Sequence, residues 1–126
     1  MRSVLTADDL KKGDLAEVGW HPAEIIDYTE KDADTDGSTN CIYHFKIIDG
    51  ASKGITCQRL FNEKALGFGK ALWPVLGIQK KADGSMEISS ELLKSKVGTK
   101  LRIYIKRGKS NKGNEFNDVQ DFQPLA

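Results

Sequence analysis

Residues 40–62 read NCIYHFKIIDGASKGITCQRLFN, and this stretch decides how the chain can fold. One side of its first half is apolar, at Cys41, Tyr43, Phe45 and Ile47. A period of two predicts a half-buried strand. Residues 55–61 are again rich in β-branched, aromatic and apolar types, and Asp49-Gly50 and Lys53-Gly54 between the halves allow the chain to reverse. The stretch therefore predicts one antiparallel hairpin.

The length of the chain indicates a single domain. With 126 residues it can bury a core without the help of disulfides or a structural metal. We expect one domain over residues 1–126, in which residues 1–18 form an extension that packs outside the main fold.

The sequence also indicates a cellular compartment. No apolar run approaches the roughly 18 residues of a membrane span, and the N-terminus lacks the apolar stretch of a signal peptide. Cys41 and Cys57 lack the spacing of metal ligands, so we expect free thiols in a cytoplasmic protein that has no membrane association.

Charge is segregated along the chain although the formal net charge is only +1. Residues 1–37 are acidic, whereas residues 92–114 contain lysines and arginines and no aspartate or glutamate. For a polyanionic ligand, local potential matters more than total charge. The basic segment is therefore the first candidate for a binding surface.

Further strands and helical segments surround the hairpin. Residues 6–13 have the pattern of a short capped helix, and residues 19–31 that of a first strand. Residues 62–77 approach helical spacing, but Pro74 and two glycines favour two short pieces. A second short helix is expected over residues 89–96, opened by Ser89 or Ser90.

The last two strands complete the order. Residues 100–106 show the cleanest alternation, in which Leu101, Ile103 and Ile105 form the apolar face. Residues 108–114 read as a basic turn and residues 115–122 as a final strand. Five strands with a helical segment between the third and the fourth predict a mainly β, OB-fold-like Greek-key barrel, a fold that binds oligonucleotides.

Several short sequence motifs indicate a family. They are Gly19-Trp20, Ala23-Glu24-Ile25, the run FKIIDG at 45–50, Lys53-Gly54, Phe61-Asn62 and GNEFN at 113–117. In these motifs the chain resembles an uncharacterised family of phage-type proteins thought to be OB-fold binders of single-stranded DNA. The resemblance covers most of residues 19–124. It implies a role in phage or prophage DNA replication or recombination, in the host cytoplasm, with replication or recombination proteins as further candidate partners.

Metal and cofactor motifs are incomplete. Residues 32–37, DADTDG, open like a calcium loop, but the twelfth position is Tyr43 instead of a bidentate glutamate. Cys41 and His44 fall on opposite faces of a predicted strand, which prevents shared zinc coordination. No phosphate-binding loop or nucleophile motif is present. We therefore expect a binding protein without metal or cofactor, and no catalytic residues.

The candidate nucleic-acid-binding residues combine cations that track phosphates with aromatic rings that stack on bases. Tyr104 is the first choice for a stacking ring and Phe61 the second, with Trp20, Tyr28 and Phe116 as further candidates, while Phe68 and Trp73 are expected in the core. Arg59 is awkward as a core residue, so we place it on the binding face. The full set is Arg59, Phe61, Lys100, Arg102, Tyr104, Lys106, Arg107, Lys109 and Lys112.

Three functions remain open from the sequence. The first is a sequence-tolerant binder of single-stranded nucleic acid, with single-stranded DNA favoured. The second is an OB-fold protein-interaction module with no nucleic-acid role. The third, which ranks behind these two, is a small hydrolase or nuclease that uses the cluster from Asp32 to Asp36 with a metal. The fold alone does not decide between them.

Overall fold

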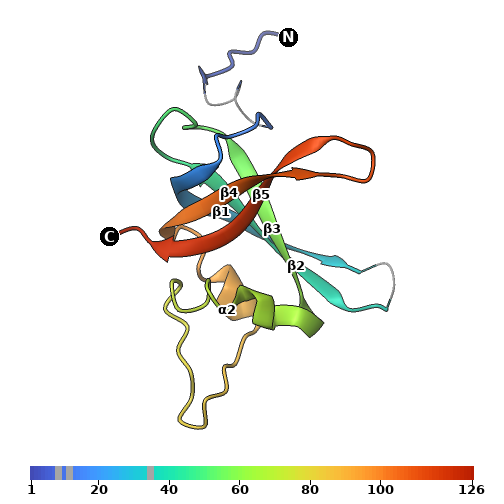
Figure 1. Cartoon of the computed structure of the whole chain (residues 1–126), viewed down its shortest axis with the longest axis vertical. Helices are drawn as coiled ribbons and strands as arrows, with labels where there is room; N and C mark the ends of the chain where they lie inside the picture. Colours follow the sequence, from blue (N-terminus) through green and yellow to red (C-terminus); the bar gives the residue numbers. More distant parts are fainter. Residues whose placement is uncertain (8–9, 11–12, 34–35) are drawn as a thin grey trace.

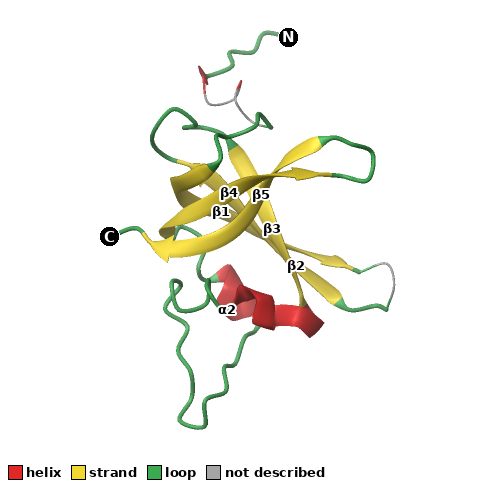
Figure 2. Ribbon diagram, viewed as in Figure 1, coloured by secondary structure: helices red, strands yellow, loops and turns green. Residues whose placement is uncertain are grey.

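The computed structural model describes residues 1–7, 10, 13–33 and 36–126. It contains five antiparallel strands in one sheet, namely β1 (Gly19–Asp32), β2 (Thr39–Ile47), β3 (Thr56–Asn62), β4 (Lys100–Lys109) and β5 (Glu115–Pro124). A 3₁₀ helix, η1 (Glu63–Gly69), and a short α-helix, α2 (Ser90–Lys94), lie between β3 and β4 (Figure 2). No helix among the described residues has the length and apolar character needed to cross a membrane. The predicted mainly β fold and its element order are confirmed.

The sheet curls into a barrel-like shape that is not closed. Its strand order is β3-β2-β1-β4-β5, so β3 and β5 are the edges, and the curl brings these edges next to one another (Figure 1). Strand β1 lies at the centre, pairing with β2 over most of its length and with β4 through Gly19–Glu24. A bulge between Ile25 and Asp27 bends β1 where it changes partners. This architecture is compatible with the OB-fold.

Two alternating strands supply much of the core. Tyr43, Phe45 and Ile47 of β2 are buried, and the apolar face of β4 is completely buried at Leu101, Ile103 and Ile105. The register of each strand therefore agrees with its sequence pattern, because a slip by one residue would expose the whole apolar set.

The helical segment covers one end of the barrel, the lower end in Figure 1. Helix α2 begins at the predicted position, since the Ser89 hydroxyl accepts from the Leu92 amide at 3.1 Å. The Tyr43 hydroxyl reaches this helix from inside the barrel and donates to the Leu93 carbonyl at 2.6 Å. Over residues 62–77, where two helical pieces are expected, η1 consists of two pieces that meet at a kink at Ala65, and residues 70–77 form successive turns.

The N-terminal extension is only partly outside the barrel. Within the predicted helix 6–13, the Leu10 amide donates to the Thr6 carbonyl at 3.2 Å, and residues 8–9 and 11–12 lie outside the described residues. Ala16, by contrast, is completely buried, and its amide donates to the Asn117 side chain at 2.8 Å. The expectation that residues 1–18 pack outside the fold is therefore wrong at Ala16, where β5 captures the extension.

Candidate nucleic-acid interface

The outer face of β4 carries the polar half of the alternating pattern. Lys100, Arg102 and Lys106 are exposed, and Tyr104 is half-buried on the same face. Their placement follows from the buried positions between them, since successive side chains of a strand point to opposite faces. The structure therefore brings four of the predicted binding residues together on one surface.

An aromatic pair lies at the centre of this face. Trp20 of β1 is directly opposite Tyr104 in the β1–β4 register, and the two ring centroids are 5.3 Å apart with an interplanar angle of 66°. The Arg102 guanidinium carbon lies 5.8 Å from the Trp20 ring centroid, within the range of a cation–π interaction. Neither ring is fully buried. Trp20, Arg102 and Tyr104 thus form a partly exposed cluster, which we call the aromatic cluster.

The basic face is less one-sided than the sequence of β4 predicts. In the β4–β5 register, Asp118 lies opposite Lys106 and Asp121 opposite Tyr104. Lys100 has Glu24 of β1 opposite it. Arg102 differs from these lysines because its cross-strand neighbours are Pro22 and Gln123, which carry no charge.

The three remaining predicted cations belong to the β4–β5 hairpin, which projects from the barrel in Figure 1. Arg107 is placed opposite Asn117, and its Nε lies 3.8 Å from an oxygen of the Glu115 carboxylate. Lys109 and Lys112 are exposed near the tip. Backbone hydrogen bonds between Ser110 and Asn114 close the turn, so both lysines extend from an ordered hairpin.

Arg59 and Phe61 do not belong to this face. Both lie on the inner side of β3, opposite Tyr43 and Cys41 of β2. Phe61 is only 2% exposed, and its ring centroid lies 5.1 Å from that of Trp73. The expectation that Phe61 is a surface ring for base stacking is therefore wrong, because its faces are covered by the core. Tyr28 is likewise buried, at 5% exposure.

Arg59 instead links the two edges of the sheet. Its Nη1 donates to the Val119 carbonyl of β5 at 2.7 Å, and its guanidinium carbon lies 4.9 Å from the Phe61 ring centroid. The side chain is half-buried. The placement of Arg59 on the binding face is corrected by these contacts, since the guanidinium is engaged between β3 and β5.

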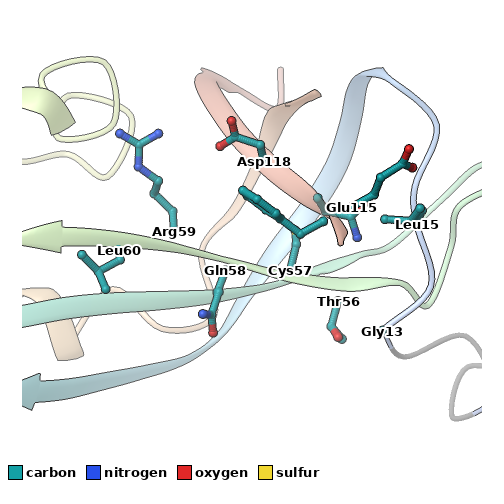
Figure 3. A pocket seen from close by; sticks show the side chains of 11 residues that line it. Gly13, Leu15, Thr56, Cys57, Gln58, Arg59, Leu60, Glu115 and Asp118 are labelled. Atoms are coloured by element: carbon teal, nitrogen blue, oxygen red, sulfur yellow. The ribbon is translucent and has the colours of Figure 1, made fainter. Parts of the chain in front are cut away.

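Beside Arg59 the edges diverge and leave a cavity of about 700 Å³, which we call the seam groove (Figure 3). Residues of the N-terminal extension, β3 and β5 line it: Gly13, Leu15, Thr56, Cys57, Gln58, Arg59, Leu60, Glu115, Phe116, Asn117 and Asp118. Two of these carry carboxylates and one a guanidinium that is already hydrogen-bonded. A lining with two carboxylates and one engaged guanidinium does not favour the binding of phosphate groups.

The cysteine thiols and the His44 imidazole have contacts that suit a structural role. Cys41 and Cys57 are free, as expected, and burial raises the pKa of the Cys57 thiol to about 12. His44 Nε2 lies 2.8 Å from the Thr29 hydroxyl oxygen, on the outer face of the sheet. Among the residues that the structure describes, no group of three or more histidines, cysteines or acids is arranged to hold a metal ion. The predicted calcium loop falls partly on residues 34–35, which lie outside the described residues.

Comparison with protein-family models and with curated proteins finds no match for this chain. Of the predicted set, Lys100, Arg102, Tyr104 and Lys106 lie together on the outer face of β4. The β4–β5 hairpin adds Arg107, Lys109 and Lys112 beyond them. Trp20 belongs to the same surface, because the β1–β4 register places it opposite Tyr104.

Proposed function

We propose that this protein binds single-stranded DNA without strong sequence preference, through the outer face of β4 and the β4–β5 hairpin. The aromatic cluster is the observation that carries this proposal. Single-strand binding needs rings for bases and cations for phosphates, and here two partly exposed rings lie against an arginine whose cross-strand neighbours are uncharged.

The charges beside the cluster restrict the path of the strand. Asp118 and Asp121 on β5 repel phosphates from that side, so the backbone is expected to follow β4 and the start of β1. From Lys100 to Lys106 this path spans about 20 Å, given about 3.3 Å per residue in a strand. It then continues to the projecting hairpin, where Lys112 lies in the turn and Lys109 follows the alternation of Ile105 on the other side of β4. The resemblance to phage-type single-strand binders supports a role in phage or prophage replication or recombination, and this role belongs to the same proposal.

A titration of labelled oligo-dT at several salt concentrations tests the proposal. Replacing Lys109 and Lys112 together by alanine should reduce the slope of log K against log salt by about 0.7 for each lost phosphate contact. Lys31→Ala is the matched control, since this exposed lysine lies at the opposite end of β1 from Trp20. Its slope should equal that of the wild type.

The aromatic cluster has a separate signature. Tyr104→Ala should weaken binding by about 1 to 3 kcal/mol while leaving the salt slope unchanged, because a base stacked on a ring releases no counterion. Tyr104→Phe should retain affinity. If the wild type fails to bind oligo-dT at low salt, the proposal is refuted.

The second candidate is a protein-interaction module without a nucleic-acid role. The seam groove favours it, because an unpaired sheet edge can accept an extended peptide as an additional strand. Its carboxylates would select a basic peptide. Absence of oligo-dT binding together with binding of an extended basic peptide would support this alternative.

A further inference from the structure

Phe68 occupies an unexpected position. Phe68 is expected in the core, yet the residue is 78% exposed. The reason is local backbone geometry: Ala65 has φ −133° and ψ 34°, which interrupts η1 and changes the direction of the residues after it. A large ring is thereby presented to solvent at the end of the molecule covered by the helical segment.

Two adjoining cavities flank η1 at this place. One, of about 520 Å³, is lined by Lys64, Ala65, Gly67, Phe68 and Lys70. The other, of about 570 Å³, is lined by Leu66, Gly67, Lys70, Trp73, Pro74, Lys80, Met86 and Ile88. They share Gly67 and Lys70, so we treat them as one surface, the lysine-rimmed groove.

The wall of this groove is preformed. The Trp73 indole N–H donates to the Leu66 carbonyl at 2.9 Å, which fixes the ring against the start of the segment. Trp73 also packs closely on the backbone of Gly69, where a Cβ atom would lie 2.2 Å from the indole. Met86 and Ile88 also line the second cavity, and methionine adapts its shape to different apolar ligands. The groove therefore combines a fixed aromatic wall with a deformable aliphatic one.

The rim is cationic. Lys64, Lys70 and Lys80 line the two cavities, and no acidic residue among those that the structure describes does so. Lys64 is paired with Asp36 at 3.0 Å, whereas Lys70 and Lys80 have no ion pair within the described part of the chain. An apolar floor with cations along its rim is complementary to a ligand that carries carboxylates beside a bulky apolar group.

We propose that the lysine-rimmed groove binds an acidic peptide segment of a partner protein, which places an aliphatic side chain against the apolar lining that includes Met86 and Ile88. The floor favours a peptide over a nucleic acid, because it is concave and lined by leucine, proline, methionine and isoleucine, whereas bases stack on flat exposed rings. The helical segment that contributes most of the groove lining lies at the opposite end of the barrel from the β4–β5 hairpin (Figure 1), so the groove and the hairpin can be tested separately.

The test uses a fluorescein-labelled peptide in which aspartates flank two leucines, followed by fluorescence anisotropy. The double variant Lys70→Glu/Lys80→Glu should weaken binding about tenfold, since two favourable charge pairs are reversed. Lys106→Glu on β4 is the matched control and should leave peptide affinity unchanged. Both replaced lysines of the double variant are exposed, so the fold should persist, and circular dichroism verifies this.

A second readout locates the peptide. The chain has two tryptophans, so Trp20→Phe leaves Trp73 as the only one, and its emission should change when the peptide binds. Phe68→Ala should weaken binding several-fold, because it removes the exposed ring at the rim. A peptide with alanines in place of the leucines should bind more weakly than the original.

Three results would overturn the inference. The first is no binding of the acidic peptide, and the second is equal binding of a peptide with lysines in place of the aspartates. The third is loss of oligo-dT binding in the Lys70→Glu/Lys80→Glu variant but not in Lys106→Glu, which would make the groove the nucleic-acid site. Failure of DNA binding alone would leave the peptide result intact.

Discussion

Replacing Gly69 by alanine tests the packing of Trp73 at a single atom. A Cβ added at Gly69 would lie 2.2 Å from the Trp73 ring, whereas ordinary van der Waals contact begins at 3.4 Å. The indole would therefore have to move by about 1 Å in a region packed at close to crystal density. Its hydrogen bond to the Leu66 carbonyl and its contact with the Phe61 ring would be strained together.

The expected cost can be estimated from these contacts. Overpacking a core typically costs about 1 to 3 kcal/mol, and a lost hydrogen bond adds about 0.5 to 1.5 kcal/mol. We therefore expect Gly69→Ala to lower the free energy of unfolding by about 2 to 4 kcal/mol. Gly69 does not have a positive φ, so backbone strain plays no part.

The measurement is urea-induced unfolding followed by tryptophan fluorescence. Gly67→Ala is the matched control, because Gly67 is in the same 3₁₀ segment, lacks a positive φ, and a Cβ added there would meet no described atom within 4 Å. That variant should be neutral or slightly stabilising, since alanine reduces the entropy of the unfolded chain. Equal stability of the two variants would refute the packing argument.

Four further outcomes are expected. Ile103→Ala should cost about 2 to 5 kcal/mol in urea unfolding because the side chain is completely buried, and a change near zero would contradict the register of β4. Tyr43→Phe should cost about 0.5 to 1.5 kcal/mol through loss of its hydrogen bond to the Leu93 carbonyl, which still accepts from the Lys96 amide; a stability equal to that of the wild type would count against that bond. Burial raises the pKa of the Cys57 thiol to about 12, whereas an unfolded thiol has a pKa of about 8.5. The thiol's contribution to the free energy of unfolding is therefore complete below about pH 8.5 and is lost as the pH rises toward the folded pKa. Cys57→Ala should therefore flatten the fall in unfolding free energy between about pH 8 and pH 10. Calcium or zinc should leave the melting temperature unchanged, because neither candidate ligand set is complete in sequence, and a rise with either ion would reverse this conclusion.

The strands that pack one face on the core could be predicted from sequence. In β2 and β4 every second residue must leave water, so the period of two fixes both the element and its inner face. The same holds for the start of α2, where Ser89 satisfies an amide that the helix itself leaves unpaired. These predictions need only local information.

Positions that depend on register between distant strands could not be predicted. Arg59 and Phe61 are in a strand with apolar side chains on both faces, so its pattern does not say which face is inner. Asp118 opposes Lys106 in the register that the hairpin turn sets, whereas Asp121 opposes Tyr104 only because a bulge shifts the register between Tyr104 and Ile105. Lys100, Arg102, Tyr104 and Lys106 therefore share one face of β4, whereas Arg59 and Phe61 on β3 lie elsewhere.

The exposed position of Phe68 has a different origin. The apolar residues around it follow a helical spacing in sequence, but the segment is a 3₁₀ helix interrupted at Ala65. Side chains three residues apart eclipse in a 3₁₀ helix instead of following the 3.6-residue period. A small change in winding thus converts an expected core ring into a surface ring.

The link between Arg59 and Val119 affects the order in which the barrel can assemble. The β1–β2 and β4–β5 hairpins close short loops, while Arg59 and Val119 are separated by 60 residues and are joined through a side chain. The loss of chain entropy on forming this contact becomes small only after the pairing of β1 with β4 has joined the two hairpins. We therefore expect the seam to form last during folding and to open first in the native state, so that the edge strand β3 exchanges its amide protons sooner than the central strand β1.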